Sequence, residues 1–291
     1  MKSIKKRNQK KNKSNKKRGG NLYPTCSVII PCIPNHIKFL DRMITSLSQQ
    51  TRKPNEIIVA VSELDRNDSN LLEKHLKKIF FKCRVYSTLS KQKSWENRDR
   101  GASISKSDYL FFLDADDECH PQRIEVGMDL VKKQNAEFIL FGGGDHNTKF
   151  EHITSYNYIT GDDIYNDEIY KNGDFPISIK HYDVNISFNN GVPLVKTDLW
   201  WKHGGQSLIV SEHPQLMRSN GIGEDVIFSR YILDKMEDKS KFMIVDSILL
   251  RKYASYLRNE DHWQIKIVPK FINLEKDQKR IIDSCISKYM V

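Results

Sequence analysis

The sequence predicts an α/β protein with a mostly parallel central sheet flanked by helices. Short runs rich in Val, Ile and Phe alternate with amphipathic segments through the first half of the chain. Each gap between apolar runs is long enough for one helix, which is typical of right-handed βαβ units. With 291 residues, of which 38% are hydrophobic, the chain can fill the core of one large domain or two small ones.

The expected elements follow one another in a regular order. Strands are expected where a short apolar run occurs, at residues 26–31, 56–61, 83–89, 109–113, 136–141 and 241–250. Helices are expected at residues 36–50, 71–80, 94–105 and 225–236, and from Pro121 onward, where a missing N–H in a first turn costs little. Gly142 to Gly144 are expected to stop the fifth strand. The polar residues 146–190 are expected to form an insertion or a mobile loop.

The positive charge of the chain is concentrated at its N-terminus. Residues 2–18 contain ten Lys or Arg and no acidic residue, and the other 37 basic and 37 acidic groups cancel. This Lys/Asn/Ser composition predicts a disordered basic tail over residues 1–20. The tail is either a solubilising leader or a contact for anionic lipid or nucleic acid. Since the remaining chain is formally neutral, no stable nucleic-acid partner is expected.

Targeting signals and cysteine usage favour a cytoplasmic protein. No apolar run reaches the ~18–20 residues that span a bilayer, and the N-terminus lacks the apolar core of a signal peptide. The five cysteines are scattered and form no C-x-x-C pair, which fits reduced thiols better than disulfides or a zinc site. We expect a cytoplasmic protein, with peripheral contact to an anionic membrane through the tail.

Three carboxylates follow the apolar run at residues 109–113. Asp114, Asp116 and Asp117 repel one another and cannot be buried unpaired. The carboxyl edge of a strand is where open α/β sheets bind ligands, and hard cations take carboxylate oxygens. The cluster therefore predicts a divalent metal that carries a phosphate-containing substrate.

Other interpretations of this cluster fit less well. An EF-hand loop would have Glu125 at its twelfth position, but Cys119 stands where Gly is needed and Pro121 falls inside the loop. A phosphoryl-aspartate hydrolase would need Thr or Val after its aspartates and a Gly nearby, and this chain has neither there. The remaining alternative is a solvated acidic turn in which Asp117 caps the next helix.

Several separated motifs carry a family resemblance. Residues 28–35 form a strand that ends in proline and a short loop with Asn, and residues 97–101 read Asn-Arg-Asp-Arg-Gly before the acidic strand. Gly204-Gly205 later precedes a Gly-Glu-Asp stretch at residues 223–225. Over roughly residues 25–255, the order and spacing of these short motifs resemble the family 2 glycosyltransferases of GT-A fold.

The resemblance implies an inverting transfer of a sugar from a nucleotide-diphosphate sugar, with a UDP-sugar favoured. The acceptor would be a hydroxyl on a glycan, a protein or a lipid-linked molecule. Asp116, together with Asp114, would hold Mn2+ or Mg2+ against the diphosphate, whose negative charge grows as the bond breaks. Asp114 could instead face the ribose, with Ala115 beside it in the donor site. Asp117 would shape the sugar pocket or begin a helix.

The resemblance also assigns a base. Asp225 matches the family position for the group that takes the acceptor proton, and Glu224 beside it is the second candidate. The alternative for Asp225 is an ordinary helix N-cap. Gly221 and Gly223 would let the preceding loop bend toward the donor.

On the nucleotide side, the implied contacts are Pro31 and Arg98, although Arg98 could be a surface ion pair. Many members have paired aspartates after the second strand, but this chain has Ser62 and Glu63 there, so these are expected to hydrogen-bond the base. Near residues 250–255, Tyr253 occupies the place of a family histidine. His262 is the candidate metal ligand in its stead, although a lone His is more often structural.

Other features leave alternatives open. Trp200 and Trp201 form either a platform for an acceptor sugar or part of the core. A nucleotidyltransferase would show a Gly-rich basic loop after the first strand, and residues 30–35 have none. A catalytically silent binding protein with a basic arm is the rival from another class.

The expected organisation is a GT-A domain over residues 21–262, with a nucleotide-binding half (21–145) and an acceptor half (146–262). A helical extension follows at residues 263–291.

Overall fold

The computed structural model describes residues 23–166, 187–188, 192–212 and 224–253. Several predictions lie outside these residues: the basic tail, the helical extension, His262, Cys285, the glycines of the loop before residue 224, and the second part of the expected loop. The predicted domain boundaries therefore stay predictions.

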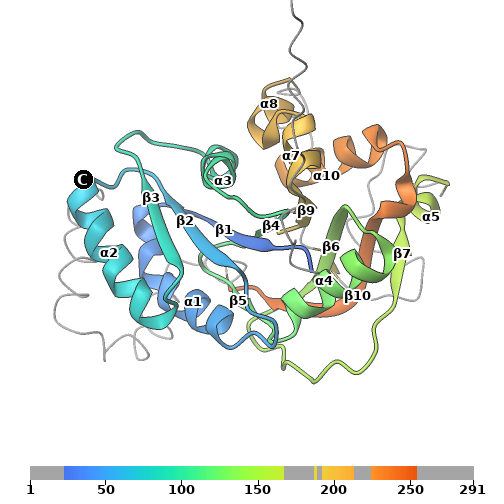
Figure 1. The fold of residues 1–291 in the computed structure, drawn as a ribbon, viewed down its shortest axis with the longest axis horizontal. Helices are drawn as coiled ribbons and strands as arrows, with labels where there is room; N and C mark the ends of the chain where they lie inside the picture. Colours follow the sequence, from blue (N-terminus) through green and yellow to red (C-terminus); the bar gives the residue numbers. More distant parts are fainter. Residues whose placement is uncertain (1–22, 167–186, 189–191, 213–223, 254–291) are drawn as a thin grey trace, which may run out of the picture.

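The strands and helices alternate along the first half of the chain, as expected (Figure 1). The strands are β1 (Cys26–Cys32), β2 (Glu56–Val61), β3 (Cys83–Ser87), β4 (Tyr109–Phe112), β5 (Glu118–Cys119), β6 (Phe138–Gly144), β7 (Tyr158–Thr160), β8 (Ser187–Phe188), β9 (Leu194–Lys196) and β10 (Phe242–Arg251). The α-helices are α1 (Leu40–Ser48), α2 (Arg66–Ile79), α3 (Ser94–Ser103), α4 (Arg123–Gln134), α5 (Gly161–Asn166), α7 (Thr197–Lys202), α8 (Gly205–Glu212) and α10 (Glu224–Lys235). Short 3-10 helices cover Pro34–Phe39 and Lys239–Lys241.

Within the described residues, the strands form one sheet in the order β3-β2-β1-β4-β9-β6-β10-β5, with β7 and β8 paired beside β10 and β6. The longer strands run parallel to a neighbour: β3, β2, β1 and β4 form one parallel set, and β6 and β10 form another. The antiparallel members β5, β7, β8 and β9 are only two or three residues long. The predicted mostly parallel α/β architecture is confirmed.

Helices cover both faces of the sheet. On one face, apolar side chains of α1, α2 and α4 pack against alternate residues of β1 and β2, such as Val28 and Ile57. On the other face, α3, α7, α8 and α10 pack against the intervening residues, such as Ile29 and Ile58. Because side chains alternate across a strand, both faces are apolar and the strands read as continuous hydrophobic runs. No described helix has the length and apolar character needed to cross a bilayer.

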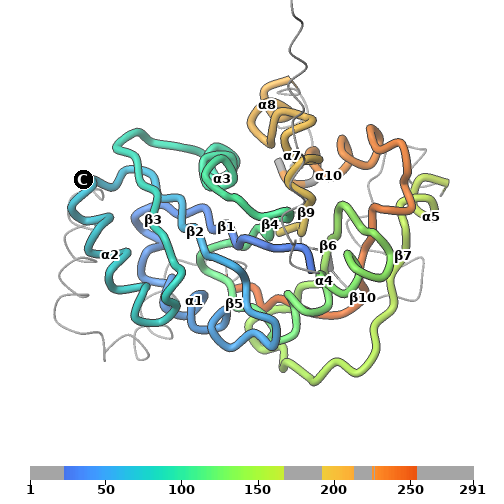
Figure 2. The backbone as a smooth tube through the Cα atoms, viewed as in Figure 1, coloured from blue at the N-terminus to red at the C-terminus, as the bar shows by residue number. Residues whose placement is uncertain are grey.

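Three local expectations were wrong. Gly142 to Gly144 do not stop a strand, because β6 continues through them and pairs with β10. The helix expected at Pro121 begins instead at Arg123, since β5 first pairs with the end of β10. For residues 146–190, expected as an insertion or a mobile loop, the loop alternative is wrong in the described part, which contains β7 and α5. Before β7, the chain runs along the outer edge of the sheet (Figure 2), where the carbonyl oxygens of Glu151 and Ile153 bond to His120 and Gln122.

Candidate active site

The acidic turn lies directly after β4. Strand pairing holds its start, because the Leu113 N–H donates to the Ile29 carbonyl at 3.1 Å. The Asp117 N–H then donates to the Asp114 carbonyl at 3.4 Å, which closes a tight turn. Asp116 and Asp117 are 5% and 2% exposed, whereas the Asp114 side chain is 34% exposed. The strand thus delivers all three carboxylates to its carboxyl end, as the sequence predicted.

Burial and mutual repulsion disfavour the ionised forms of Asp116 and Asp117. Burial raises the pKa of Asp116, and repulsion from Asp114 raises it further. Burial also raises the pKa of Asp117 well above its usual range, with Asp114 and Asp116 adding to the effect. Since like charges disfavour one another's ionisation, a cation placed among them would be bound favourably.

A pH-dependent stability follows from Asp117. Its folded pKa lies above its unfolded value, so the cluster's contribution to stability is greatest below the unfolded pKa and is lost as pH rises through the folded pKa. Asp117→Asn removes this loss and keeps an acceptor for the Tyr253 N–H. In EDTA, we expect the variant to melt roughly 3 °C or more above the parent chain at pH 8 and the gap to narrow at pH 5.

Asp162→Asn, in the exposed first turn of α5, is the matched control and should show no pH-dependent gap. A constant or inverted difference for Asp117→Asn across this pH range would contradict the burial of an ionisable carboxylate here.

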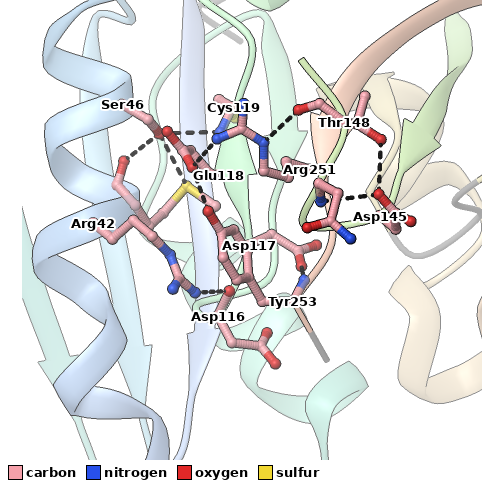
Figure 3. Close-up of polar contacts among 12 residues, drawn as sticks. Arg42, Ser46, Asp116, Asp117, Glu118, Cys119, Asp145, Thr148, Arg251 and Tyr253 are labelled. Atoms are coloured by element: carbon pink, nitrogen blue, oxygen red, sulfur yellow. Dashed lines mark hydrogen bonds and ion pairs between the residues drawn. The ribbon is translucent and has the colours of Figure 1, made fainter. Parts of the chain in front are cut away.

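Arg42 and Tyr253 stack on each other and contact the acidic turn (Figure 3). Arg42 of α1 donates a hydrogen bond to the Asp116 carbonyl, and its guanidinium carbon lies 3.6 Å from the centroid of the Tyr253 ring. The Tyr253 N–H donates to Asp117 Oδ1 at 3.3 Å, and the Tyr253 hydroxyl donates to Glu118 Oε2 at 2.8 Å. Arg251 donates to the same Glu118 oxygen at 2.8 Å. Tyr253 therefore fixes the acidic turn through its backbone, while Glu118 takes its hydroxyl.

Arg98 lies in the interior, not at the surface. It is 4% exposed, and its Nη2 donates to Asp114 Oδ1 at 2.9 Å. Its Nη1 donates to Gln206 Oε1 at 3.2 Å, which links α3 to α8. The neighbouring Asp99 accepts from the Gln206 and Ser207 N–H groups at 2.9 and 2.8 Å. The alternative of a surface ion pair is thus wrong, since Arg98 orients Asp114 from within the protein.

The residues expected on the nucleotide side gather at the carboxyl ends of β1 and β2. Pro31 pairs with Ala60 of β2, beyond the last residue of β1 that pairs with β4, so its missing N–H breaks no ladder bond there. Ser62 is buried, and its hydroxyl accepts from Asn97 Nδ2 at 3.3 Å. Glu63 has φ +55, which is uncommon for a residue with a side chain. Ser62 thus links β2 to α3, and Glu63 begins the loop beyond it.

Asp225 lies in the first turn of α10, which begins at Glu224, so Asp225 is not the N-cap. Lys252 connects it electrostatically to the acidic turn. Burial lowers the pKa of Lys252, and the carboxylates of Asp117, Asp114 and Asp225 oppose that shift. The candidate base and the acidic turn therefore act on the same ammonium group. Ala115, which is 1% exposed, belongs to the core.

The carboxylates fit a divalent cation of the kind that substrate phosphates help to hold. The described residues contain no group of three or more His, Cys, Asp or Glu side chains arranged around one point. Mg2+ and similar ions at phosphate sites, however, are commonly held by one or two carboxylates, with phosphate oxygens and water as the other ligands. Asp116, whose ionisation is opposed by burial and by repulsion from Asp114, and the Asp114 carboxylate itself provide such a donor set.

Sequence reasoning missed several residues of this site. Arg42 bonds to the acidic turn, Lys252 interacts electrostatically with it, and Gln206 bonds to Arg98, all from distant parts of the sequence. The only sequence signal was the position of Lys252 beside Tyr253 and of Gln206 after the Gly-Gly pair. Trp200, expected as a possible platform, is a core residue, 1% exposed and stacked 4.2 Å from Phe112. Trp201 remains 40% exposed.

A mostly parallel sheet covered by helices on both faces, with an acidic turn at the carboxyl end of β4, defines a GT-A type nucleotide-sugar-binding fold. Residues 27–185 match the model of the family described as glycosyl transferase family 2. Since this match covers more than half of the chain, the chain belongs to that family, and the predicted family is confirmed. Family membership supports transferase activity and gives no support to the nucleotidyltransferase alternative.

Two curated relatives share part of the sequence. Poly(ribitol-phosphate) beta-N-acetylglucosaminyltransferase TarP of Staphylococcus aureus is 31% identical over 120 residues, which is 39% of this chain and 35% of TarP. Cholesterol galactosyltransferase of Borreliella burgdorferi is 30% identical over 113 residues, which is 39% of this chain and 31% of that protein. The aligned segments thus span about a third of each relative.

The fold is similar to that of S. aureus TarS. The superposition covers 91% of this chain and 43% of TarS, with a TM-score of 0.53 at 13% identity. A shorter TarS structure solved in complex with UDP matches with a TM-score of 0.51, and so does one in complex with UDP-GlcNAc. At this identity the likeness concerns the fold, and it confirms the predicted GT-A class.

Proposed function

We propose that this protein transfers a sugar, with inversion, from a UDP-sugar to an acceptor hydroxyl in a reaction that depends on Mn2+ or Mg2+. The observation that carries the proposal is the buried acidic turn at the end of β4. Asp225 supports it, because its charge and those of the turn act on the same Lys252 ammonium group. The UDP and UDP-GlcNAc complexes of the TarS neighbours support a UDP-linked donor. The relatives' names support acceptors as different as a polyol-phosphate polymer and a sterol.

In this mechanism, the acceptor oxygen forms a bond to the anomeric carbon as the bond from that carbon to the diphosphate oxygen breaks. The acceptor proton passes to the Asp225 carboxylate, with Glu224 as the second candidate, and the electron pair leaves with UDP. Asp116, together with Asp114, would hold the metal, which when bound neutralises charge on the departing diphosphate. Arg98 holds the Asp114 carboxylate in place, and Arg42 holds the Asp116 backbone.

Glu63 and Ser62 are proposed to bind the base. The left-handed backbone of Glu63 supports a functional role, because such conformations in residues other than Gly gather at binding sites. The buried hydroxyl of Ser62 is bonded to Asn97, which favours a positioning role for it. Pro31 would shape the floor beneath the nucleotide.

We further propose that the enzyme works in the cytoplasm, in peripheral contact with an anionic membrane. The ten Lys or Arg of residues 2–18 support this placement, because basic segments are attracted to anionic lipid surfaces.

A thermal-shift screen of nucleotide sugars, with and without Mn2+, tests the donor assignment. A ligand present at 100 times its Kd stabilises the folded state by about 2.7 kcal/mol. This corresponds to a rise in Tm of roughly 5–10 °C for a domain of this size. We expect a UDP-sugar with Mn2+ to give the largest rise. Equal rises for other nucleotide sugars, or none for UDP-sugars, would count against the donor.

A further inference from the structure

A cavity lies at the opposite end of the parallel strands from the acidic turn. It has a volume of about 560 Å³ and is lined where β1, β2 and β3 begin and just before β4. Its lining includes Thr25, Lys77, Phe81, Lys82, Arg84 and Lys106. The acidic turn lies at the carboxyl ends of the same strands. Since β1 has seven residues at about 3.3 Å each, roughly 20 Å of sheet separates the two places.

The charged side chains that line this cavity are mostly basic. The lining carries four cationic side chains and one carboxylate, that of Glu56. Lys77 is paired with Glu73, and Arg84 lies 2.6 Å from Glu56. Lys82 and Lys106, by contrast, have no carboxylate within ion-pair distance in the part of the chain that the structure describes. The cavity therefore presents uncompensated positive charge, which attracts an anion.

An exposed aromatic ring accompanies this charge. Phe81 lies in the turn after α2, lines the cavity and is 83% exposed. Single exposed apolar side chains are common on protein surfaces, so the ring is informative here because it lies among lysines. A lipid surface, however, offers both phosphate groups for lysines and an acyl boundary for an aromatic side chain.

The basic tail precedes the described part of the chain, which starts at this same end of the strands. Tyr23 is the first described residue of the chain, and Thr25, two positions later, lines the cavity. Thr25 is fixed there, because its N–H and its hydroxyl both donate to Asp108 Oδ2 at 2.8 Å. In the sequence, the ten Lys or Arg of residues 2–18 thus precede by a short stretch a residue that lines the cavity together with Lys82 and Lys106.

We propose that the surface around this cavity, which carries Phe81, Lys82 and Lys106, is the membrane-docking face of the protein. It would bind anionic phospholipid, with head-group phosphates at Lys82 and Lys106 and Phe81 inserted at the acyl boundary. The acidic site would then face away from the bilayer, at the other end of the sheet. This inference rests on the proposed membrane contact and assigns it to a face of the folded chain, and it does not depend on which donor is used.

Co-sedimentation of the full chain with vesicles tests this face. With vesicles of phosphatidylglycerol and phosphatidylcholine in 0.1 M salt, we expect Lys82→Glu/Lys106→Glu to lower the partition coefficient by roughly tenfold or more. Phe81→Ser, which leaves every charge in place, is expected to lower it several-fold. The matched control is Lys202→Glu/Lys235→Glu, which makes the same charge change at two exposed lysines of α7 and α10.

Two results would overturn the proposal. One is an equal loss of binding in the control double variant, which would mean that only net charge matters. The other is unchanged vesicle binding by Phe81→Ser together with binding of soluble polyphosphate that Lys82→Glu/Lys106→Glu abolishes, which would make the face a polyanion site. Donor-dependent UDP release in solution should be unchanged in both docking variants, so a failed donor assignment and a failed docking face are distinguishable.

Discussion

Asp116→Asn is expected to reduce the release of UDP from a UDP-sugar by at least roughly a hundredfold, the range seen when a group that stabilises transition-state charge is removed. The change removes one negative charge and almost no volume. The hydrogen bond from Arg42 ends on the Asp116 backbone carbonyl, so the turn keeps that contact. The loss is therefore expected in turnover and metal dependence, not in folding.

The control for Asp116→Asn is Asp162→Asn, an exposed aspartate of α5 that lies outside the acidic turn. It should retain full turnover. A coupled assay for UDP, run over a series of Mn2+ concentrations, measures both variants. If Asp116→Asn kept the turnover and the Mn2+ dependence of the parent chain, Asp116 would not be a metal ligand.

Asp225→Asn is expected to abolish transfer while leaving donor binding intact. An amide cannot take the proton of the acceptor hydroxyl, and the loss of general-base catalysis typically costs 10²–10⁴ in rate. The donor is proposed to bind at the acidic turn and at the ends of β1 and β2, so its affinity should change little. Calorimetric titration with the UDP-sugar measures the affinity, and UDP release in the presence of acceptor measures the transfer.

Two further variants sharpen this test. Asp234→Asn changes an exposed aspartate of the same helix and should be neutral for transfer. Glu224→Gln separates the two candidate bases, because only the variant of the true base loses transfer. Full transfer by Asp225→Asn, with loss in Glu224→Gln, would move the role to Glu224.

Most of the fold could be predicted because its longer strands are buried on both faces. Residues such as Val28 and Ile58 make continuous apolar runs that are visible without any partner. The short antiparallel strand β9 was missed because its pairing with β4 and β6 is set by residues more than 50 positions away. Gly142 to Gly144 were misjudged for a related reason, since local propensity opposes a strand there and pairing with β10 overrides it.

The candidate site was predictable where one segment contains its chemistry. Asp114, Asp116 and Asp117 are adjacent in sequence and follow a strand, so their meeting at one edge needed no tertiary knowledge. The groups that hold them could not be found in this way. Arg42 comes from α1 and Tyr253 from the end of β10, and only the folded chain stacks one on the other. The metal, donor and base roles of the individual residues stay predictions.

Calorimetric titration of a UDP-sugar into the full chain tests the central claim most directly. We predict saturable binding of one donor per chain in Mn2+, with at least a tenfold loss of affinity in EDTA, because the diphosphate would then meet uncompensated carboxylates. Binding of equal strength with and without the metal, or no binding of any UDP-sugar under either condition, would contradict the proposed donor site at the acidic turn.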